Sequence, residues 1–595
     1  MIYIDYIDET NDAVISTSEP DELFEKMKGY FSEGSIYPNK IEVKWNIYLQ
    51  KIHFVEYLVN SGLTIKYSDL AKKLISSSNN NRKLFLHPRD EIQVTTLRRK
   101  LKEKDFQRKL FNFQERNVLK LISRNAGASF SVPGAGKTTE ALAYFTYLCS
   151  EKDKLLVICP KNAFNPWKEE VTSETGCFKK YENNFHILDA QTNKKKGNLE
   201  KIFKSDSKYF VTNYDQVVNN QNSIIKFLKE NNVFLIIDES HNIKGRDSQR
   251  TRIMLEICFL AKYKLILSGT PVPNRIDELV PQFNFLYPEV PSNGIDILEK
   301  INGIYVRTNR SELDIPNEKI LSVPVPMSRN QKVLYKLVRN HAVRDIAANR
   351  NRNIEIIRKS IILIIQLLSN PLLGIERYAS IPGIKNNTRI LENLRSPKID
   401  YAVSLARDLA AEDKKVIIWS LFVKNVKIIK ARLEDLGAVA IHGSVKIEER
   451  ELAVDAFNND PSCKVIVINP AAGSEAISLH KNCNNAIYID TGYNSVYWLQ
   501  SIDRIRRIGQ QHEPIIHVLK HAQTLDDQIE HRLRDKVELM QQVLNDDSIL
   551  AEKFSIDLDE TNNYDDDYFD LGIEQEINGI IDALKSEMEN DYSLL

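Results

Sequence analysis

Short apolar runs alternate with helical stretches in two separate series, and this alternation limits the folds open to the chain more than any other feature. The first series lies between about residues 110 and 285 and contains "LLVIC", "KYFVT", "VFLII" and "YKLIL". The second lies between about 396 and 540 and contains "KVIIW", "GAVAI", "CKVIVIN", "NAIYID" and "PIIHVL". Buried runs separated by helices predict parallel sheets, because helical crossovers cover both faces of such sheets. The sequence therefore predicts an α/β fold with two lobes.

Five segments follow from these series and from the composition around them. At 595 residues the chain exceeds what one hydrophobic core organises, so several domains are expected. We predict a small mixed α/β accessory domain at 1–107, lobe 1 at 108–285, a helical insertion or bridge at 286–395, lobe 2 at 396–540, and an acidic and helical tail at 541–595.

The accessory domain carries three signals. In "KIEVKWNIYL" the apolar residues alternate from Ile41 to Ile47, which predicts a strand with Glu42 and Lys44 on its polar face; an E-x-K nuclease pair is the less favoured alternative. "SSSNNNR" at 76–82 predicts a loop. Residues 53–75 predict two packed helices, with a DNA-reading helix-turn-helix as the alternative.

Composition excludes several classes of protein. The chain has no run of eighteen apolar residues, and "MIYIDYIDETND" lacks the basic and apolar parts of a secretory signal, which favours a cytoplasmic location. Six cysteines without a C-x-x-C pair favour reduced, mostly buried thiols over disulfides or structural zinc. Because Lys+Arg and Asp+Glu balance at 81 each, nucleic-acid binding would have to come from a local groove.

The tail changes character along its length. Residues 556–570, "IDLDETNNYDDDYFD", hold seven acidic side chains and no basic one, which predicts an extended stretch, either a solvated tail or a regulatory segment. A stripe at helical spacing follows, made of Ile573, Ile577, Ile580, Ile581, Leu584 and Met588. This stripe predicts a helix that docks on this chain or on another. We expect a protein partner at the tail or at the accessory domain.

"SVPGAGKTTEAL", from Ser131 to Leu142, follows a strand-like stretch and leads into a helix, as a phosphate-binding loop does. Glycines let backbone N–H groups approach an anion, and the helix N-terminus adds partial positive charge. Lys137 is expected at the β and γ phosphates and the Thr138 hydroxyl on Mg²⁺. Ser131 stands where the pattern G-x-x-x-x-G-K-[ST] has its first glycine. The predicted nucleotide-binding residues of the loop are Gly134, Ala135, Gly136, Lys137, Thr138 and Thr139.

Two further clusters supply charge for phosphoryl transfer. The apolar run of "VFLIIDESHNIKG" ends in Asp238 and Glu239, which predicts Mg²⁺ binding by Asp238 and activation of water by Glu239. In "QSIDRIRRIGQ", Arg504 and Arg507 are three residues apart and face one way on a helical turn, whereas Arg506 points elsewhere. A surface basic patch is the alternative for these arginines. The predicted catalytic residues are Lys137, Asp238, Glu239, Arg504 and Arg507.

The ordered set of motifs resembles superfamily-two helicases, and within them the Swi/Snf-type ATPases that move along duplex DNA. The resemblance covers roughly residues 108–535. In the first half it rests on "LFNFQERNVLKLI", "VICPKNAFNPWKEE", "FVTNYDQV", "DESHNIKG", "LILSGTPVPNRIDEL", "YVRTNRSEL" and "SRNQKVLYKLV". In the second half it rests on "IIWSLF", "AIHGSV" and "IYIDTGYNSVYWLQSIDRIRRIGQ", whose closing R-I-G-Q is particularly characteristic.

The resemblance implies two tandem RecA-like lobes that bind ATP and Mg²⁺ between them, with Arg504 and Arg507 reaching the γ-phosphate when the lobes close. It implies Gln114 as the adenine contact and Gln500 as a further nucleotide contact. It also implies double-stranded DNA as a partner, held through its backbone. The candidate nucleic-acid contacts are Lys161, Thr212, Asn213, Tyr214, Lys244 and Ser420.

One motif departs from the pattern of the family. Where the family usually has A-G-G-x-G-x-N-L, this chain reads "AGSEAISL", with Ser474 and Ala476 in place of glycines and Ser478 in place of asparagine. Side chains are strained at positions that need a positive φ. The departure makes coupling between DNA contact and hydrolysis less secure than the ATP site.

These observations predict an ATP-dependent double-stranded DNA translocase or remodeller. An RNA- or RNA-polymerase-remodelling ATPase, a strand-separating helicase and a low-turnover assembly subunit switched by ATP remain as alternatives. The Asn-, Ile- and Lys-rich composition suggests an AT-rich bacterial or phage-related genome. Compact members of the resembled family there often belong to anti-phage systems, which implies antiviral defence as a setting.

Overall fold

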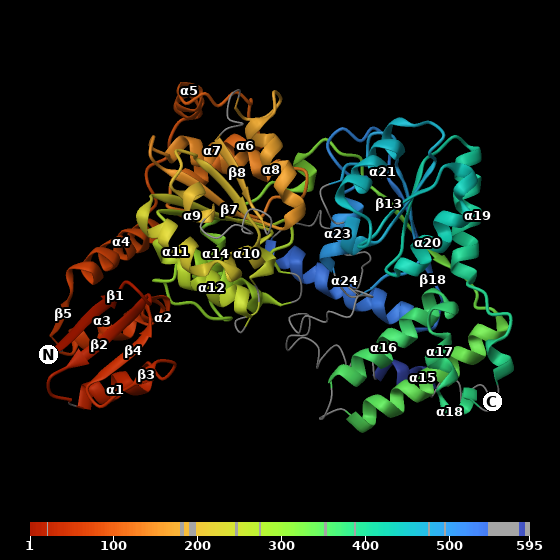
Figure 1. Ribbon diagram of the computed structural model, residues 1–595, viewed down its shortest axis with the longest axis horizontal. Helices are drawn as coiled ribbons and strands as arrows, with labels where there is room; N and C mark the ends of the chain where they lie inside the picture. Colours follow the sequence, from red (N-terminus) through yellow and green to blue (C-terminus); the bar gives the residue numbers. More distant parts are fainter. Residues whose placement is uncertain are drawn as a thin grey trace. The chain divides into compact units, whose positions relative to one another are not determined.

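The computed structural model describes residues 1–20, 22–62, 64–178, 184–189, 198–243, 245, 248–272, 275–349, 354–385, 388–473, 477–492, 495–544 and 582–588. The chain divides into two compact units, Met1–Glu312 and Leu313–Leu595, and each is described by itself (Figure 1).

The first unit begins with a five-stranded mixed sheet, drawn in red in Figure 1. Its order is β3 (Ser35–Ile36), β4 (Lys40–Lys44), β2 (Asp12–Thr17), β1 (Ile2–Ile7) and β5 (Ile65–Tyr67). The helices of this part are α1 (Glu22–Tyr30), α2 (Trp45–Gln50), α3 (Ile52–Asn60) and α4 (Asp69–Leu86). Phe24, Trp45 and Tyr48 are fully buried in the core between sheet and helices. The predicted mixed α/β character of this region is confirmed.

Two predictions for this region are wrong. The strand expected from Ile41 to Ile47 ends at Lys44, and Trp45 begins helix α2, because the indole packs edge-on against Tyr6 in the core. The polar run at 76–82 lies inside helix α4 and is not a loop. The Ser68 hydroxyl caps this helix by accepting from the Ala71 N–H, and burial of Ala71 and Ser78 outweighs the weak helix propensity of Ser and Asn.

The first unit continues with a seven-stranded sheet in which every pair of neighbouring strands is parallel. Its order is β12 (Tyr305–Val306), β6 (Ala126–Ser129), β11 (Tyr263–Leu267), β10 (Val233–Asp238), β7 (Lys154–Ile158), β9 (Tyr209–Thr212) and β8 (Phe185–Leu188). The helices nearest to the site are α5 (Val94–Glu103), α6 (Asn112–Ile122), α7 (Lys137–Leu148), α8 (Phe164–Thr172), α10 (Tyr214–Asn219), α11 (Gln221–Glu230), α12 (Gln249–Ile257) and α13 (Leu279–Leu286). Helices α6, α7 and α8 lie on one face of the sheet and α10, α11 and α12 on the other (Figure 1).

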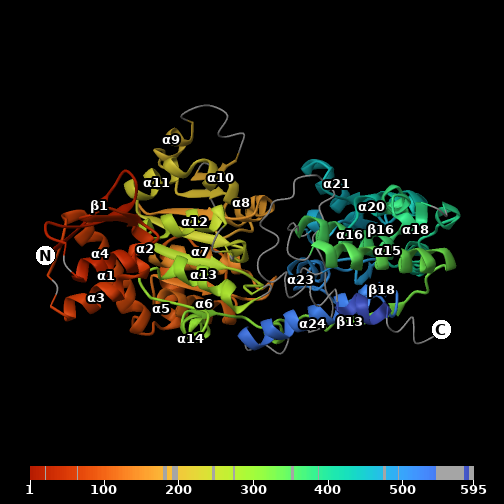
Figure 2. The same ribbon diagram turned by 90° about the horizontal axis from the view of Figure 1, so that it is seen from below.

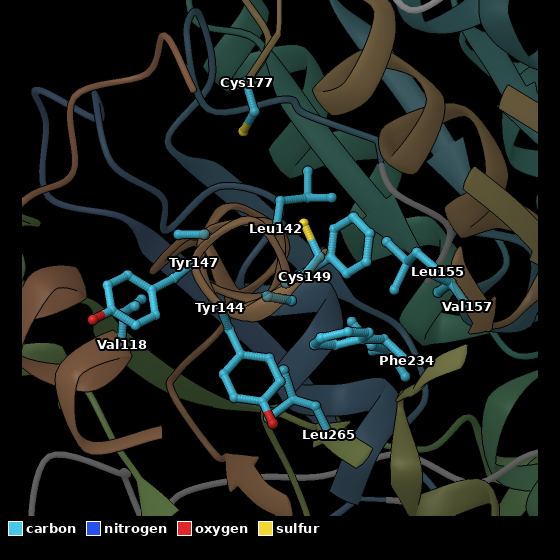
Figure 3. Close-up of a cluster of buried hydrophobic side chains, with 14 of the residues drawn as sticks. Val118, Leu142, Tyr144, Tyr147, Cys149, Leu155, Val157, Cys177, Phe234 and Leu265 are labelled. Atoms are coloured by element: carbon cyan, nitrogen blue, oxygen red, sulfur yellow. The ribbon is translucent and has the colours of Figure 1, made fainter. Parts of the chain in front are cut away.

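Helix α7 is the centre of one hydrophobic core. Leu142, Tyr144 and Phe145 of this helix are buried among residues of strands β7 and β10, including Leu155 and Phe234 (Figure 3). Phe145 and Phe234 meet edge to face with their ring centroids 4.9 Å apart. The helix that follows the glycine-rich loop is therefore held rigidly against the sheet.

The second unit contains a six-stranded sheet that is also parallel throughout. Its order is β13 (Lys319–Pro324), β18 (Ile515–Lys520), β17 (Asn485–Tyr488), β14 (Val416–Trp419), β16 (Val465–Ile468) and β15 (Val439–Ile441). Its main helices are α15 (Arg329–Asn349), α16 (Ile354–Ser369), α19 (Pro397–Ala411), α20 (Val423–Arg432), α21 (Ile447–Asn459), α23 (Ser495–Ile502) and α24 (Leu525–Leu544). Helices α15 and α16 lie side by side (Figures 1 and 2). The predicted α/β class with two parallel-sheet lobes is confirmed.

The segment predicted as a helical bridge, 286–395, is shared between the units. Its first part includes strand β12, which pairs with β6 in the sheet of the first unit. Strand β13, a few residues later, pairs with β18 in the sheet of the second unit. Neither strand resembles the buried apolar runs, because β12 has two residues and β13 has no fully buried residue. Helix α14 (Ile297–Asn302) lies in the first part of the segment, and the longer helices begin with α15.

A short helix at 582–588 packs inside the second unit and is drawn in dark blue in Figure 1. Its Ala583 and Leu584 are buried, and Glu587 accepts a hydrogen bond from the Tyr335 hydroxyl of α15 at 2.9 Å. Docking of the predicted apolar stripe is thus confirmed for Leu584. The acidic stretch at 556–570 and the isoleucines of the stripe lie outside the described residues.

Two other sequence predictions can be compared with the structure. All six cysteines are buried and free, as predicted. Within the described ranges, no helix is long and apolar enough to cross a membrane.

Candidate functional site

The predicted phosphate-binding loop connects β6 to α7 at the carboxyl edge of the seven-stranded sheet. Gly134 has a φ of 85° and Gly136 a φ of 81°, both in the left-handed region that favours glycine. Gly136 is the N-cap of α7, so the loop ends at a helix N-terminus, where free N–H groups and the helix dipole favour an anion. The Lys137 ammonium donates a hydrogen bond to the Ser131 carbonyl at 3.0 Å. The loop therefore combines the N–H groups of a helix N-terminus with a lysine.

Gln114 of α6 lies against this loop. Its amide nitrogen donates to the Ala135 carbonyl at 3.0 Å, and its amide oxygen accepts from the Phe111 N–H at 3.0 Å. A Cβ atom at Gly136 would collide with the Gln114 amide, so packing and φ both require glycine there. The structure thus brings Gln114 to the loop, and its contact with adenine remains a prediction.

Thr138 and Thr139 begin helix α7 and face different surroundings. Thr139 is buried, and its hydroxyl donates to the Glu170 carboxylate of α8 at 3.3 Å. Thr138 is half-buried. Only the Thr138 hydroxyl fits the predicted role of a magnesium ligand, whereas Thr139 offers its backbone N–H.

Asp238 is the last residue of β10, and Glu239 follows it at the same sheet edge. Glu239 has a φ of 54°, a left-handed conformation that costs a non-glycine residue roughly 1–3 kcal/mol and is concentrated at functional sites. Its carboxylate lies 3.3 Å from Nδ1 of His241, whose ring is also 3.3 Å from the Ser268 hydroxyl. The "DESHNIKG" and "LILSGTPVPN" motifs therefore meet at this edge.

Burial, Glu239 and a hydrogen bond from Trp167 together determine the ionisation of Asp238. The Trp167 indole N–H donates to Asp238 Oδ2 at 2.9 Å, and the Glu239 N–H donates to Oδ1 at 2.9 Å. Burial and the adjacent Glu239 carboxylate raise the pKa of Asp238, while the Trp167 hydrogen bond and Lys137 lower it, which leaves the pKa at about 6. At neutral pH Asp238 is therefore mostly a carboxylate and can bind a divalent cation.

The sequence placed Trp167 in a motif facing DNA and gave no sign of its contact with Asp238. Trp167 is buried, and its partner Asp238 lies 71 positions further along the sequence. The residues around Trp167 do not indicate this contact.

Gly269 brings a second loop against the phosphate-binding loop. A Cβ atom there would lie 2.9 Å from the ring of Pro133 and 3.6 Å from Lys137 Nζ. The segment that follows β11 therefore approaches the loop so closely that a side chain does not fit. In the sequence analysis Gly269 appears only within the motif "LILSGTPVPNRIDEL". Its structural role depends on the close approach of this segment to the loop that carries Lys137.

The predicted nucleic-acid contacts of the first unit differ in exposure. Lys161 is exposed at the start of a short 3-10 helix after β7. Thr212 is buried and its hydroxyl donates to the Leu188 carbonyl at 3.0 Å. Asn213 is buried as the N-cap of α10, with Oδ1 accepting from the Gln216 N–H at 3.0 Å. Lys244 lies outside the described residues.

Tyr214 connects the segment after β9 to the backbone of Asp238 and Glu239. Its buried hydroxyl lies 2.7 Å from the Asp238 carbonyl and 3.2 Å from the Glu239 carbonyl. In the described conformation the side-chain oxygens of Thr212, Asn213 and Tyr214 make hydrogen bonds within the unit. Contacts with nucleic acid by these three residues therefore remain a prediction that needs exposure of their backbone or side chains.

In the second unit, Arg504 and Arg507 lie on the turn that follows α23. The Arg504 guanidinium donates to the Gln500 carbonyl at 3.0 Å and to the Ile477 carbonyl at 3.3 Å. Arg507 donates to the Ser478 hydroxyl, and burial lowers its pKa without removing its charge. Both predicted arginines thus reach the segment 477–478, and they face one way, as their spacing predicted. Gln500 reaches the same cluster through its backbone.

Arg506 points away from this pair. It is buried, and its guanidinium pairs with the Glu318 carboxylate and, at 3.4 Å, with Asp503. Gln510 fixes the end of the turn, because its amide nitrogen is 3.0 Å from the carbonyls of His480 and Cys483. The R-I-G-Q sequence therefore holds the turn that carries Arg504 and Arg507.

Ser420 is fully buried at the end of β14. Its hydroxyl donates to Asp490 Oδ2 at 2.8 Å, in a network that also includes Ser369 and Asn425. The side chain predicted to bind nucleic acid is therefore used inside the unit in the described conformation. Ser474 and Ala476 of the altered motif lie outside the described residues.

Two stretches of the chain match known family models. Residues 123–302 match the SNF2-related domain, and residues 397–509 match the helicase conserved C-terminal domain. The glycine-rich loop, Asp238 and Glu239 lie inside the first match, and Arg504 and Arg507 lie inside the second. These matches support the predicted enzyme class, a helicase-like ATP hydrolase.

Several curated relatives of this chain are chromatin or DNA proteins by name. It is 25% identical over 470 residues to the ISWI chromatin-remodeling complex ATPase ISW1 of Saccharomyces cerevisiae, covering 73% of this chain and 40% of the relative. It is 24% identical over 464 residues to the human DNA annealing helicase and endonuclease ZRANB3, covering 73% and 40%. It is 24% identical over 461 residues to the ATP-dependent DNA helicase DDM1 of Arabidopsis thaliana, covering 68% and 58%. The chain thus spans about two fifths of the first two relatives.

Among solved structures, the chain is similar to the Sulfolobus solfataricus SWI2/SNF2 ATPase core in complex with dsDNA. The identity is 22%, the TM-score is 0.32, and the match covers 75% of this chain and 94% of that chain. A TM-score this low carries no argument about overall arrangement, and the fold rests on the strand orders given above.

Proposed function

We propose that this chain hydrolyses ATP and uses the energy to move along double-stranded DNA. The observation that carries the proposal is the meeting of three elements at one sheet edge: the Lys137 loop, the Asp238 and Glu239 pair, and the Gly269 segment. Carboxyl edges of parallel sheets are where α/β proteins bind their ligands. The matches to the SNF2-related and helicase C-terminal domains and the names of the relatives support ATP as the nucleotide and DNA as the track.

The residues of the first unit fit a magnesium nucleotide. The N–H groups at the start of α7 would hold phosphate oxygens, and Lys137 Nζ would exchange the Ser131 carbonyl for a phosphate oxygen. The Thr138 hydroxyl and the Asp238 carboxylate would hold Mg²⁺, which neutralises charge on the phosphates when bound. Glu239 would accept a proton from the attacking water, since its backbone conformation fixes it beside Asp238.

The second unit would contribute positive charge that acts in the transition state of the reaction. We propose that Arg504 and Arg507 act on the same ATP that the Lys137 loop holds, and that hydrolysis thereby changes the relative pose of the units. Arginine supplied in this way stabilises the charge of a phosphoryl-transfer transition state. The shared contact of both guanidinium groups with residues 477–478 supports their action as a pair.

The test is hydrolysis of ATP by the wild type and by Glu239→Gln, measured with duplex DNA, single-stranded DNA and RNA. We expect duplex DNA to stimulate the wild type most, and the Gln side chain to lower kcat by about 100-fold or more, because it cannot accept the proton. Displacement of a triplex strand without unwinding of the duplex would support translocation. Equal, slow hydrolysis by both proteins with every nucleic acid would contradict the motor proposal.

A second candidate is an assembly subunit that binds ATP as a switch and turns over slowly. Ser478 favours it, because this residue stands in place of the asparagine of the family and accepts a hydrogen bond from Arg507. Tight ATP binding without stimulated hydrolysis would support this candidate. Preferential stimulation by RNA would instead support an RNA-remodelling role. The anti-phage setting remains a prediction from the family resemblance.

A further inference from the structure

Glu140 is a buried carboxylate on helix α7, one turn after Lys137, and neither the catalytic scheme nor the predicted nucleotide contacts use it. Its side chain has no exposed surface. A carboxylate at such a place needs hydrogen-bond partners, because an unpaired buried charge is strongly unfavourable. Its partners therefore indicate what the residue does.

Two side chains donate to Glu140. The Asn117 amide of α6 donates to Oε1 at 2.8 Å, and the Ser129 hydroxyl at the end of β6 donates to Oε2 at 2.9 Å. Burial raises the pKa of the Glu140 carboxyl group, whereas the two hydrogen bonds and the charges of Lys137 on its own helix and Arg116 on α6 lower it. Glu140 thus joins three elements that surround the phosphate-binding loop.

The network extends to the loop itself through Ser131. The Asn117 amide lies 3.4 Å from the Ser131 hydroxyl, and the Ser129 hydroxyl lies 3.3 Å from it. The Ser131 carbonyl is the acceptor that holds Lys137. A glycine, which the usual pattern has at this position, would lack the hydroxyl. Ser131 can therefore connect the lysine to the buried network.

The same network reaches the segment where the first unit ends. The Thr308 N–H donates to the Ser131 hydroxyl at 3.0 Å, and the Asn117 amide donates to the Thr308 hydroxyl at 2.9 Å. Thr308 is fully buried, and the unit ends at Glu312. The chain thus leaves the first unit along a segment that is hydrogen-bonded to the phosphate-binding loop.

We propose that Glu140 is a positioning residue that fixes Ser131 through Ser129 and Asn117, and so couples nucleotide binding at the loop to residues 305–312. This inference rests on the proposed function, because the ligand of the loop is taken to be ATP. When Lys137 moves from the Ser131 carbonyl to a phosphate, Ser131 loses one hydrogen bond. The hydrogen-bond network around Glu140 then transmits that change to Thr308. The helix dipole and the glycines alone provide no such route.

The experiment combines nucleotide affinity with hydrogen–deuterium exchange of residues 305–312 in the full chain. The variants are Glu140→Ala, which removes both acceptors, Glu140→Gln, which keeps one acceptor and can donate to Ser129, and Ser131→Gly. The matched control is Glu289→Gln, because Glu289 is also a buried carboxylate but lies near Lys264, at the opposite end of strand β11 from Ser268. A fluorescent ATP analogue reports the Kd, and steady-state hydrolysis reports kcat.

We expect Glu140→Ala to weaken nucleotide binding by about tenfold or more and to speed exchange at 305–312 with or without nucleotide. Glu140→Gln should restore both readouts to within about threefold of the wild type, and Glu289→Gln should leave them unchanged. Ser131→Gly, which retains the loop backbone, should abolish the effect of nucleotide on exchange at 305–312.

The inference is overturned if Ser131→Gly and Glu140→Ala both show wild-type exchange at 305–312 and wild-type affinity. It is also overturned if Glu140→Gln is as impaired as Glu140→Ala, since a specific charge would then matter more than the hydrogen-bond network. A wild type that binds no nucleotide would instead defeat the proposed function. In that case exchange at 305–312 without nucleotide would still distinguish Glu140→Ala from Glu289→Gln.

Discussion

At the scale of single residues, the candidate site depends on contacts that determine the charge of Asp238. Asp238 is enclosed at the end of a buried strand, and its charge is maintained by one indole N–H and one backbone N–H. Its pKa of about 6 is raised above the ordinary value by burial and by Glu239. An acid with a raised pKa is protonated as the pH falls through that value, so magnesium binding by Asp238 should be lost below about pH 6.

Trp167→Phe tests this assignment. Removing the indole N–H destabilises the ionised form of Asp238 and raises its pKa, so the acid limb of the pH profile of ATP hydrolysis should move to higher pH. The shift should be roughly 0.4–1 unit, as a net hydrogen bond of 0.5–1.5 kcal/mol implies. Trp419→Phe is the control, because Trp419 is buried in the second unit. An unmoved acid limb in Trp167→Phe would show that Asp238 does not set it.

The residue types of the site could be read from the sequence, but several of their partners could not. Spacing placed Lys137, Asp238 and Glu239 at strand ends, because loops at that edge follow directly from the α/β alternation. The contact of Trp167 with Asp238 and the hydrogen bond from Thr308 to Ser131 join residues 71 and 177 positions apart. Such contacts depend on tertiary packing, which a local pattern does not contain.

At the scale of elements, the Tyr214 side chain attaches α10 to the sheet edge that carries Asp238 and Glu239. The Tyr214 hydroxyl donates toward the carbonyls of Asp238 and Glu239, while its backbone begins the helix that follows a motif predicted to face DNA. This attachment gives a physical route by which a displacement of α10 could move the carboxylates.

Tyr214→Phe removes the hydroxyl and keeps the ring in its buried position. We expect the stimulation of ATP hydrolysis by duplex DNA to fall by roughly two- to tenfold, the equivalent of one net hydrogen bond. Tyr401→Phe, at an exposed position on α19, is the control. A variant that is stimulated as strongly as the wild type would show that α10 and the carboxylates are not coupled through Tyr214.

Elements were predictable where their pattern was strong. All nine apolar runs in the two series are strands, because parallel strands buried on both faces require continuous apolar sequence. The Ser- and Asn-rich run inside α4 was predicted wrongly, since its helix is set by a cap and by packing and not by propensity. The sequence carries no signal for strands β12 and β13. They are strands because they pair with β6 and β18, and their own residues do not form a buried apolar run.

At the scale of the whole molecule, the tail helix at 582–588 belongs to the core of the second unit. Leu584 is fully buried, and Glu587 pairs with Tyr335 and, at 3.3 Å, with Arg339 of α15. A segment far from the sheet in sequence therefore contributes to the stability of this unit.

Leu584→Ala tests that contribution. A buried leucine truncated to alanine costs about 2–5 kcal/mol, so the second unit should unfold at a lower temperature, while the first unit should be unaffected. Differential scanning calorimetry measures both transitions. Lys585→Ala, at an exposed position of the same helix, should leave them unchanged. Equal stability of Leu584→Ala and the wild type would show that the helix is not docked in solution.

The central claim is that the lysine-bearing loop of the first unit and the arginines of the second serve one ATP. The most direct measurement is single-turnover hydrolysis by Arg507→Ala with duplex DNA, alongside its Kd for ATP and an Arg407→Ala control at an exposed position of α19. We predict a rate lowered by about 1,000-fold or more with a Kd within about threefold of the wild type, because the arginine acts on the transition state. A rate for Arg507→Ala equal to that of the wild type and of Arg407→Ala would contradict the claim.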